Sequence, residues 1–332
     1  MRGLPHDLEP RMFKPLAVAL LLGLASPSLV AKPPVTKPAT ASTVPVPLLW
    51  KACDADNCLY LLGSFHLLKP SDYPLSKDVD GAFVDAEKLV FEVPPAEMES
   101  PELQQTMMMA AIRRDGTQLK SELTASQNAK LDAWLNKNEA SLAKQGIAPA
   151  MFQMFKPWFA GLMVTMTGMA DMGMQAELGL DRHFMGLASK ADKPVSGLES
   201  GAGQIALLSG MSPEEQRQML EESLDSVSGG GAETKKLHDA WRRGDVDALL
   251  SGTINEMKKE YPRLYKAINV DRNDAWVPKL EQRLKAKGTD DHLVVVGAMH
   301  LLGSDGVVEK LRGKGYKVER VCSACSVKPK KK

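Results

Sequence analysis

The chain has 332 residues, of which 44% are hydrophobic and 25% charged, and its 42 basic side chains almost balance its 41 acidic ones. These values are typical of a folded globular protein and exclude a disordered chain, a collagen-like repeat or a coiled-coil rod. A formal net charge of +1 also argues against a nucleic-acid partner, because nucleic-acid-binding proteins usually carry a basic surplus or a basic stripe. A chain of this length can bury a core in one large or two medium domains.

Residues 1–31 have the pattern of a secretory signal peptide. Arg11 and Lys14 precede an uncharged apolar run over residues 16–24, and small residues follow it. The run is too short for a permanent membrane helix, so we expect no stable membrane span in the mature chain. The pattern predicts export across the inner membrane to the periplasm, from a translation start at Met1 or Met12.

Residues 32–47 form a predicted linker. They are rich in Pro, Thr, Ala, Val and Lys and show neither a helical nor a strand period, which is typical of an extended segment. The folded domain is expected to span residues 48–325, and a short basic tail over 326–332 ends the chain.

Four cysteines lie near the two ends of the predicted domain. Cys53 and Cys58 flank a turn-forming tetrapeptide, and Cys322 and Cys325 form a CxxC pair. Three arrangements compete: two local disulfides, cross-pairing between the ends, or a four-thiolate zinc site. Export permits disulfides, and the Cx4C spacing of the first pair departs from the usual zinc spacing, so disulfides are favoured over zinc, while local pairing and cross-pairing both stay open.

The first predicted elements of the domain are a strand, a helix and a strand. Residues 59–62 form a short apolar run stopped by Gly63, which predicts a buried strand. A helix is expected over 78–87, and a second strand over 88–93 precedes two prolines. This order predicts a βαβ unit and therefore a parallel pair of strands.

The middle of the chain, about residues 97–285, is predicted to be helical. Thr124 or Ser126 can cap one helix, and residues 212–215 carry a capping Ser, a first-turn Pro and a third-position Glu that predict the start of another. Residues 155–169 carry aromatic residues, Leu and Met at helical spacing. This predicts either a buried core helix, which we favour, or a methionine-lined groove for an apolar ligand.

The end of the chain returns to strands. After a helix over 277–285, residues 292–296 predict a third strand stopped by Gly297, followed by a helix over 305–312 and a last strand over 317–321. The predicted fold class is therefore α/β, with a mixed, partly parallel central sheet built from both chain ends and a large helical middle segment.

Two segments near the ends of the domain resemble each other. One contains Gly63 and His66, the other Gly297 and His300, and each runs from an apolar strand through a glycine, a small residue and a large apolar residue to His-Leu-Leu. GxxH alone is a weak motif, but both histidines lie just past the carboxyl end of a buried strand, where α/β sheets bind ligands. The glycines are expected to allow a sharp turn and a close approach to a ligand.

Glu92 is a charged residue inside the apolar strand over 88–93, and a carboxylate is costly to bury unless it is paired or bound to a metal. If the strands are neighbours, His66, Glu92 and His300 meet at one end of the sheet. Two imidazoles and a carboxylate can hold a divalent metal with an open position for water, which the metal would turn into a hydroxide nucleophile. The alternative is that the histidines are hydrogen-bonded structure and that Glu92 pairs with an arginine.

Together the motifs resemble the TraB/GumN family, also called the TraB/PrgY/GumN group, over nearly all of the predicted domain. The group is related to the Tiki metalloproteases and more remotely to erythromycin esterases and the haem-binding ChaN proteins. The family usually has Gly-Thr-x-His where this chain has Gly63, Ser64 and His66, so the hydroxyl is kept. The other matching segments are 73–75, 90–93, 156–158, 179–181, 196–199 with 204, 272–273 and 295–303.

The resemblance implies a divalent-metal hydrolase fold. His66, Glu92 and His300 correspond to the family's histidine and glutamate positions, as metal ligands and catalytic residues, and Arg272 is a further catalytic candidate. The metal is expected to be Mn, Co or Zn. In the Tiki relatives such a site goes with proteolysis, so the expected substrate is a peptide or a small molecule.

Other polar residues in the matching segments are candidates for substrate contacts or for support of the site: Ser64, Asp181, Glu199, Gln204 and Asn273. One interpretation has Arg272 binding a substrate carboxylate or an oxyanion, with Glu199 orienting a histidine. The other has Arg272 in a structural ion pair with Asp181 or Glu199. The remaining histidines of the domain are expected to be structural or solvated: His183, His238 and His292.

We therefore expect an exported, divalent-metal-dependent hydrolase, with peptidase as the favoured activity. Two other functions stay open. The first is a non-catalytic protein that binds haem or a metal in the same cleft, as the relation to ChaN allows. The second is a protein that sequesters secreted peptides. The sequence does not predict an oligomeric state.

Overall fold

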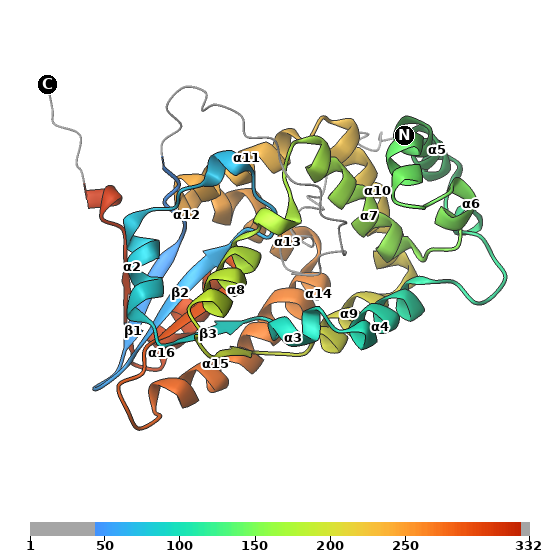
Figure 1. Cartoon of the computed structure of the whole chain (residues 1–332). Helices are drawn as coiled ribbons and strands as arrows, with labels where there is room; N and C mark the ends of the chain where they lie inside the picture. Colours follow the sequence, from blue (N-terminus) through green and yellow to red (C-terminus); the bar gives the residue numbers. More distant parts are fainter. Residues whose placement is uncertain (1–43, 327–332) are drawn as a thin grey trace, which may run out of the picture.

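The computed structural model describes residues 44–326, and its core is a six-stranded sheet (Figure 1). The strands are β1 (Leu49–Cys53), β2 (Cys58–Ser64), β3 (Lys88–Phe91), β4 (Val195–Gly197), β5 (His292–Gly297) and β6 (Lys317–Arg320). Their spatial order is β4-β3-β5-β2-β1-β6. The first four strands in this order run parallel, whereas β1 is antiparallel to both β2 and β6. This confirms the predicted mixed, partly parallel sheet built from both chain ends.

The two strands of the predicted βαβ unit run in the same direction but are not neighbours. They are connected through α2 (Lys77–Asp85), and β5 lies between them and pairs with both. The predicted parallel direction is confirmed, but the strands are not adjacent, because the pattern of two strands does not reveal a third strand that inserts between them. The predicted helical middle also contains β4, which is short and begins with the exposed Val195.

Both cysteine pairs form local disulfides. In the β1–β2 hairpin, Cys53 lies opposite Cys58, and their sulfur atoms are 2.02 Å apart. Cys322 and Cys325 form the second disulfide, with a sulfur–sulfur distance of 1.96 Å. The prediction of disulfides is confirmed, and the structure decides the pairing that the sequence left open: both bonds are local, so cross-pairing and a four-thiolate zinc site are excluded.

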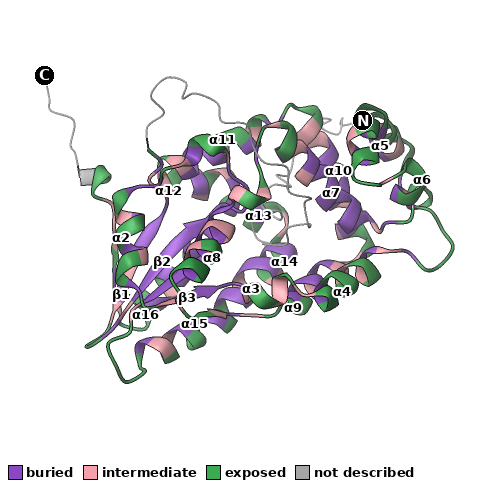
Figure 2. Cartoon of the chain, in the orientation of Figure 1, coloured by how far each residue is buried: buried purple, intermediate pink, exposed green. Residues whose placement is uncertain are grey.

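Helices cover the sheet and extend beyond it. Their bounds are α3 (Pro95–Met98), α4 (Pro101–Ala111), α5 (Ala125–Lys144), α6 (Pro149–Phe152), α7 (Pro157–Asp171), α8 (Leu180–Lys190), α9 (Gly201–Ser209), α10 (Pro213–Ser228), α11 (Ala232–Arg242), α12 (Val246–Leu249), α13 (Asn255–Glu260), α14 (Pro262–Tyr265), α15 (Asp271–Leu284) and α16 (Val307–Gly313). In Figure 1, α5, α6, α7 and α10 lie away from the sheet. Figure 2 shows buried strands and exposed outer faces of the helices.

The capping signals predict two helix starts correctly. Thr124, rather than Ser126, caps α5 in a capping box with Gln127, and Ser212 forms the same motif with Glu215 at α10. The helix predicted over 277–285 begins earlier, at the start of α15, and Pro278 lies inside it. Proline is usually a start signal, so the sequence pattern places the start too late.

The methionine-rich segment is a buried helix, as favoured from the sequence. Most residues of α7 are buried, and α7 packs along α10. A Cβ atom on Gly161 would lie 3.1 Å from the Cα atom of Leu220, so the glycine allows the two helices to approach closely.

The folded part begins slightly before the expected boundary. Pro45 and Pro47 are buried, and the backbone N–H of Val46 donates to the carbonyl of Arg242 at 2.8 Å. The predicted signal peptide, most of the predicted linker and most of the basic tail lie outside the described residues. Across residues 44–326, no helix has the length and apolar character needed to cross a membrane.

A buried acid joins two parts of the helical region. Glu222 on α10 is 7% exposed, and its Oε1 accepts a hydrogen bond from the Tyr261 hydroxyl at 2.6 Å. Burial raises the pKa of Glu222 to about 9. The native state therefore binds one more proton than the unfolded chain between the ordinary value of 4.5 and about 9, and its stability falls as the pH rises through that window.

Glu222→Gln is expected to raise the free energy of unfolding by about 2 kcal/mol at pH 8 and to change it little near pH 4.5. Glutamine keeps an acceptor for Tyr261 and has no charge to bury. Urea unfolding at several pH values measures the effect, with the exposed Glu214→Gln on the same helix as control. If the stability of Glu222→Gln depended on pH as that of the unmodified protein does, Glu222 would not be the group with the raised pKa.

Candidate functional site

The two predicted histidines and Glu92 follow three neighbouring strands. His66 follows β2, Glu92 follows β3, and His300 lies in the 3-10 helix η6 (Ala298–Leu301) after β5. Because these strands are parallel and adjacent, all three side chains lie at the same carboxyl edge of the sheet. All three are buried, and His66 is close enough to influence the titration of the other two. The structure therefore brings the three residues together.

Hydrogen bonds fix the tautomer of His300. Nη1 of Arg272 lies 2.9 Å from Nε2 and can only donate, so Nε2 accepts. Nδ1 lies 2.7 Å from Oδ1 of Asn273, whose amide nitrogen donates to two other acceptors, so Nδ1 carries the proton. Burial, followed by the charges of Arg272 and His66, lowers the pKa of His300 well below its usual value. His300 is a neutral imidazole with both ring nitrogens hydrogen-bonded.

Arg272 on α15 binds two carboxylates. Its Nη2 lies 2.6 Å from Oε2 of Glu92 and 2.6 Å from Oε1 of Glu199, and its Nε also donates to Glu199. Its Nη1 donates to the carbonyl of Ile268 and to His300. Burial acts to lower the pKa of Arg272, but the two carboxylates outweigh it and raise that pKa, while burial raises the pKa of Glu92. The five N–H donors of this guanidinium all point at protein acceptors.

Glu199 pairs with Arg272 and does not orient a histidine, so the structure selects the second of the two interpretations made from the sequence. It accepts hydrogen bonds from Arg272, from Nε2 of Gln204 at 2.7 Å and from Nε1 of Trp276 at 3.1 Å. The Glu199 carboxylate thus holds the guanidinium that contacts His300.

Trp276 belongs to this cluster and was missed from the sequence. Its ring centroid lies 4.4 Å from that of His300, and the guanidinium carbon of Arg272 lies 4.8 Å from the centroid of the same indole. Trp276 follows Arg272 by four residues, so both occupy one face of α15. That spacing was the available signal.

The predicted metal ligands do not form an open coordination site in this arrangement. The guanidinium of Arg272 holds Oε2 of Glu92 and Nε2 of His300, the atoms through which those residues would bind a cation. Within the described residues, no group of three or more His, Cys, Asp or Glu side chains is placed to hold a metal ion. The donor set fits a divalent metal only if Arg272 withdraws, so the metal stays a prediction.

His66 is held by a second, separate network. Its Nδ1 lies 2.6 Å from Oδ2 of Asp181, and the hydroxyl of Ser64 donates to the same oxygen at 2.5 Å. Burial acts to raise the pKa of Asp181, but the charge of His66 and the hydrogen bonds from His66 and Ser64 outweigh it and lower that pKa. Asp181 is therefore an acceptor, so Nδ1 of His66 carries a proton, and in the neutral form of the ring the lone pair lies on Nε2.

A glycine lets α8 carry Asp181 to His66. A Cβ atom on Gly179 would lie 2.0 Å from the carbonyl oxygen of His66, so no larger residue fits. The backbone N–H of Leu180 donates to the carbonyl of Phe65 at 3.1 Å. The first turn of α8 is thus fixed to the loop that carries His66.

Gly63 and Gly297 are not the sharp turns that we expected. Gly63 lies inside β2, Gly297 ends β5, and neither has a positive φ. A Cβ atom on Gly63 would lie 3.1 Å from Ala298 and from Leu48. Gly63 therefore allows close packing against the segment that carries His300. Gly297 contributes its backbone N–H, which donates to Oε1 of Glu92 at 2.7 Å.

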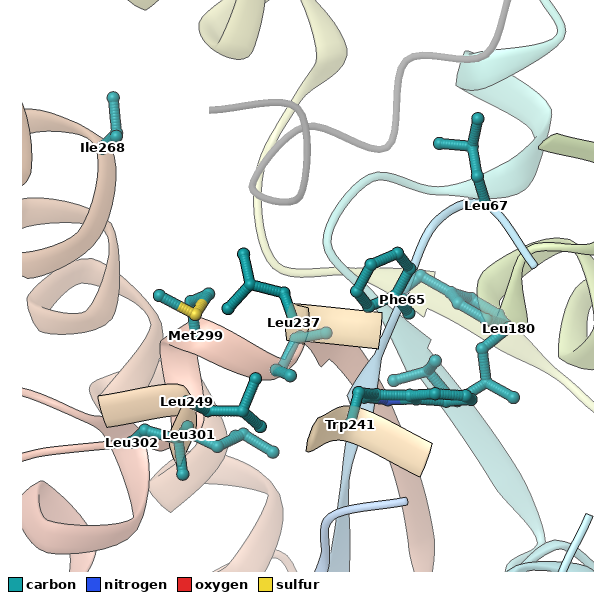
Figure 3. Close-up of a cluster of buried hydrophobic side chains, with 14 of the residues drawn as sticks. Phe65, Leu67, Leu180, Leu237, Trp241, Leu249, Ile268, Met299, Leu301 and Leu302 are labelled. Atoms are coloured by element: carbon teal, nitrogen blue, oxygen red, sulfur yellow. The ribbon is translucent and has the colours of Figure 1, made fainter. Parts of the chain in front are cut away.

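Apolar side chains hold both histidine loops in place (Figure 3). Residues next to the two histidines are buried: Phe65, Leu67, Met299 and Leu301. Leu237 of α11 lies between Phe65 and Met299 in Figure 3. Trp241 on the same helix donates from Nε1 to the carbonyl of Gly63 at 2.9 Å. α11 therefore packs against both loops.

His238 on α11 is structural, as expected. It is buried, and its Nε2 lies 2.8 Å from Oδ2 of Asp72, which also accepts from Arg242. This pairing ties α11 to the segment that follows His66. His183 is only partly buried, on α8, and His292 begins β5 at the far end of the sheet.

The sequence that builds this site matches that of known proteins. A family model described as the TraB/PrgY/gumN family matches residues 48–320. The chain belongs to this family. Its matched segment contains both histidine loops, Glu92, Asp181 and Arg272.

Two curated relatives are similar to part of the chain. They are named "Uncharacterized protein YbaP", from Escherichia coli (strain K12) and from Shigella flexneri, and each is 26% identical over 172 residues. The match covers 51% of this chain and 61% of each relative, so the chain spans about three-fifths of the length of the curated relatives it matches. No solved structure gives a significant match.

Proposed function

We propose that this family member is an exported hydrolase of amide or ester bonds, with peptides as the favoured substrates. The observation that carries the proposal is the His66–Asp181 pair at the carboxyl edge of the parallel strands. An imidazole whose Nδ1–H is held by a buried carboxylate presents Nε2 as a general base. The two disulfides support the export part, because disulfides persist in oxidising compartments.

The proposed reaction uses water as the nucleophile. Nε2 of His66 takes a proton from water, the resulting hydroxide attacks the carbonyl carbon, and the tetrahedral intermediate collapses as the C–N or C–O bond breaks. His66 then returns the proton to the leaving group. Asp181 keeps its negative charge and stabilises the protonated imidazole between these two steps.

The network around Arg272 holds side chains in place and takes no part in the proposed bond cleavage. All five donors of Arg272 are directed at protein acceptors, so we assign it to holding Glu92, Glu199 and His300 rather than to binding an oxyanion. Gln204 adds a feature that suits an amide substrate. Its Oε1 is buried and has no hydrogen-bond partner within the described residues, so a substrate N–H can bind there.

The divalent metal stays part of the proposal as a cofactor to be tested. His66, Glu92 and His300 would hold Mn, Co or Zn once Arg272 had released the last two, and the metal would activate water. No step of the reaction above depends on it. Haem binding and peptide sequestration by the same residues are outcomes that the experiment below distinguishes.

The test is a hydrolysis screen with peptide and ester pools, using protein purified from the exported fraction, with and without EDTA, alongside elemental analysis. We expect cleavage that survives chelation and disappears in His66→Ala, while His183→Ala, a control on α8, keeps it. Near-stoichiometric metal together with loss of cleavage in EDTA would replace this mechanism by the metal-dependent one. No cleavage, with either a Soret band on haem titration or peptide binding alone, would overturn the hydrolase proposal.

A further inference from the structure

A second polar pocket lies at the opposite edge of the sheet, where the parallel strands begin. Lys88 is the first residue of β3, His292 is the first residue of β5, and the two are partners in the strand register. With the β1–β2 turn residue Asn57 and the end of α15, they line a cavity of about 380 Å³. The catalytic candidates all lie at the carboxyl edge, so this pocket is separate from them.

The pocket carries more positive than negative charge. Lys88 is paired with Asp290 at 2.6 Å, but Arg283 and Lys287 form no ion pair with any described residue. Arg283 is held by neutral oxygens, the carbonyl of Lys279 at 2.8 Å and the hydroxyl of Ser196 at 3.2 Å. Burial lowers the pKa of Arg283, with no carboxylate to oppose it. A partly buried guanidinium without a counter-ion favours an anion.

Two buried polar atoms in the same pocket lack hydrogen-bond partners within the described residues: Oδ1 of Asn57 and Nδ1 of His292. Asn57 is 4% exposed and His292 is 8% exposed. The amide nitrogen of Asn57 donates to the carbonyls of Ala286 and Gly288, so this amide cannot be turned over and its Oδ1 needs a donor. Buried groups of this kind normally have partners, so a ligand with its own donor groups would complete the pocket.

We propose that this pocket binds a protonated phosphate group, either free hydrogen phosphate or that of a phosphomonoester. Arg283 and the lysines supply charge-assisted donors for the phosphate oxygens, whereas Asn57 Oδ1 or His292 Nδ1 accepts the hydrogen bond from its O–H. Burial, and then the charges of Arg283 and Lys88, lower the pKa of His292, so the ring stays neutral and keeps an acceptor nitrogen. Sulfate has the same shape without a proton, so the acceptors disfavour it.

Isothermal titration of the full chain with inorganic phosphate, methyl phosphate and sulfate tests the proposal. We expect phosphate to bind roughly tenfold or more tightly than sulfate, because sulfate leaves buried acceptors unpaired. Tighter binding of methyl phosphate than of phosphate assigns the pocket to a phosphorylated molecule, and the reverse assigns it to the free ion. Equal binding of phosphate and sulfate, or no binding of phosphate, overturns the proposal.

Two substitutions separate charge from proton recognition. Arg283→Gln is expected to weaken binding of both anions by roughly 10- to 100-fold, whereas Arg217→Gln on α10, which removes the same charge outside the pocket, leaves binding unchanged. Asn57→Ala is expected to reduce the preference for phosphate over sulfate. Because Asn57 also ties the hairpin to the loop after α15, the phosphate-induced shift of the His292 ring signals in NMR spectra of the unmodified protein provides a measurement without substitution. An absent shift contradicts the site.

Discussion

Replacing Arg272 by methionine is expected to destabilise the protein by about 3–5 kcal/mol, because the change leaves two buried or partly buried carboxylates without their cation. Glu92 is 4% exposed, and the side chain of Glu199 is 19% exposed. Methionine fills much of the same volume, so the loss reflects charge rather than a cavity. Urea unfolding measures the change.

The pH dependence of this loss identifies its cause. Burial raises the pKa of Glu92, and removing Arg272 takes away the charge that opposes this rise. A group whose native pKa lies above its unfolded value stabilises at low pH and loses that contribution as the pH rises, so the deficit of Arg272→Met grows from pH 4.5 upwards. The double variant Arg272→Met/Glu92→Gln is expected to recover part of the loss. A deficit no larger than that of the partly exposed control Arg217→Met would contradict a buried charge cluster.

The same variant shows whether the guanidinium and a divalent cation compete for the same atoms. In Arg272→Met, Oε2 of Glu92 and Nε2 of His300 lose the donor that holds them. Mn, Co or Zn is therefore expected to raise the melting temperature of the variant more than that of the unmodified protein. Tight metal binding by the unmodified protein that Arg272→Met abolishes would instead make Arg272 a support of a metal site.

The fold was largely predictable because its signals are local. Apolar runs interrupted by glycine or proline mark the parallel strands, and capping residues such as Thr124 and Ser212 mark helix starts. The position of β5 between β2 and β3 was not predictable, because it depends on pairing between distant segments. β4 is too short and too exposed to show a hydrophobic period.

The site was predictable only in part. The repeated strand-glycine-histidine pattern places His66 and His300 at one sheet edge, but nothing near His66 reveals that Asp181 comes from a helix 115 residues away. Likewise, the sequence offers Arg272 both as a ligand-binding residue and as an ion pair, and only the direction of its N–H groups decides between them. Residue type therefore identifies the candidates, whereas hydrogen-bond geometry decides what each of them does.

Asp181→Asn is expected to lower kcat by roughly 10²- to 10⁴-fold. The asparagine amide can present a donor to Nδ1, which favours the tautomer with the proton on Nε2 and removes the lone pair that takes the proton from water. The change also removes the negative charge that favours the protonated imidazole, so the acid limb of the pH–rate profile should move to lower pH. Steady-state kinetics from pH 4 to 9 on a substrate from the screen measures both effects.

Ser64→Ala is the matched comparison, because it removes the other hydrogen bond to the same carboxylate oxygen and leaves the charge in place. Its effect on kcat should be about tenfold or less, without a shift of the acid limb, since one neutral hydrogen bond is lost. If Asp181→Asn and Ser64→Ala had equally small effects, the pair would be structural and His66 would act without it. A large loss in Asp181→Asn with an unmoved profile, by contrast, would mean that Asp181 orients the ring but contributes no charge stabilisation. The size of the loss and the movement of the limb therefore separate tautomer control from electrostatics at this pair.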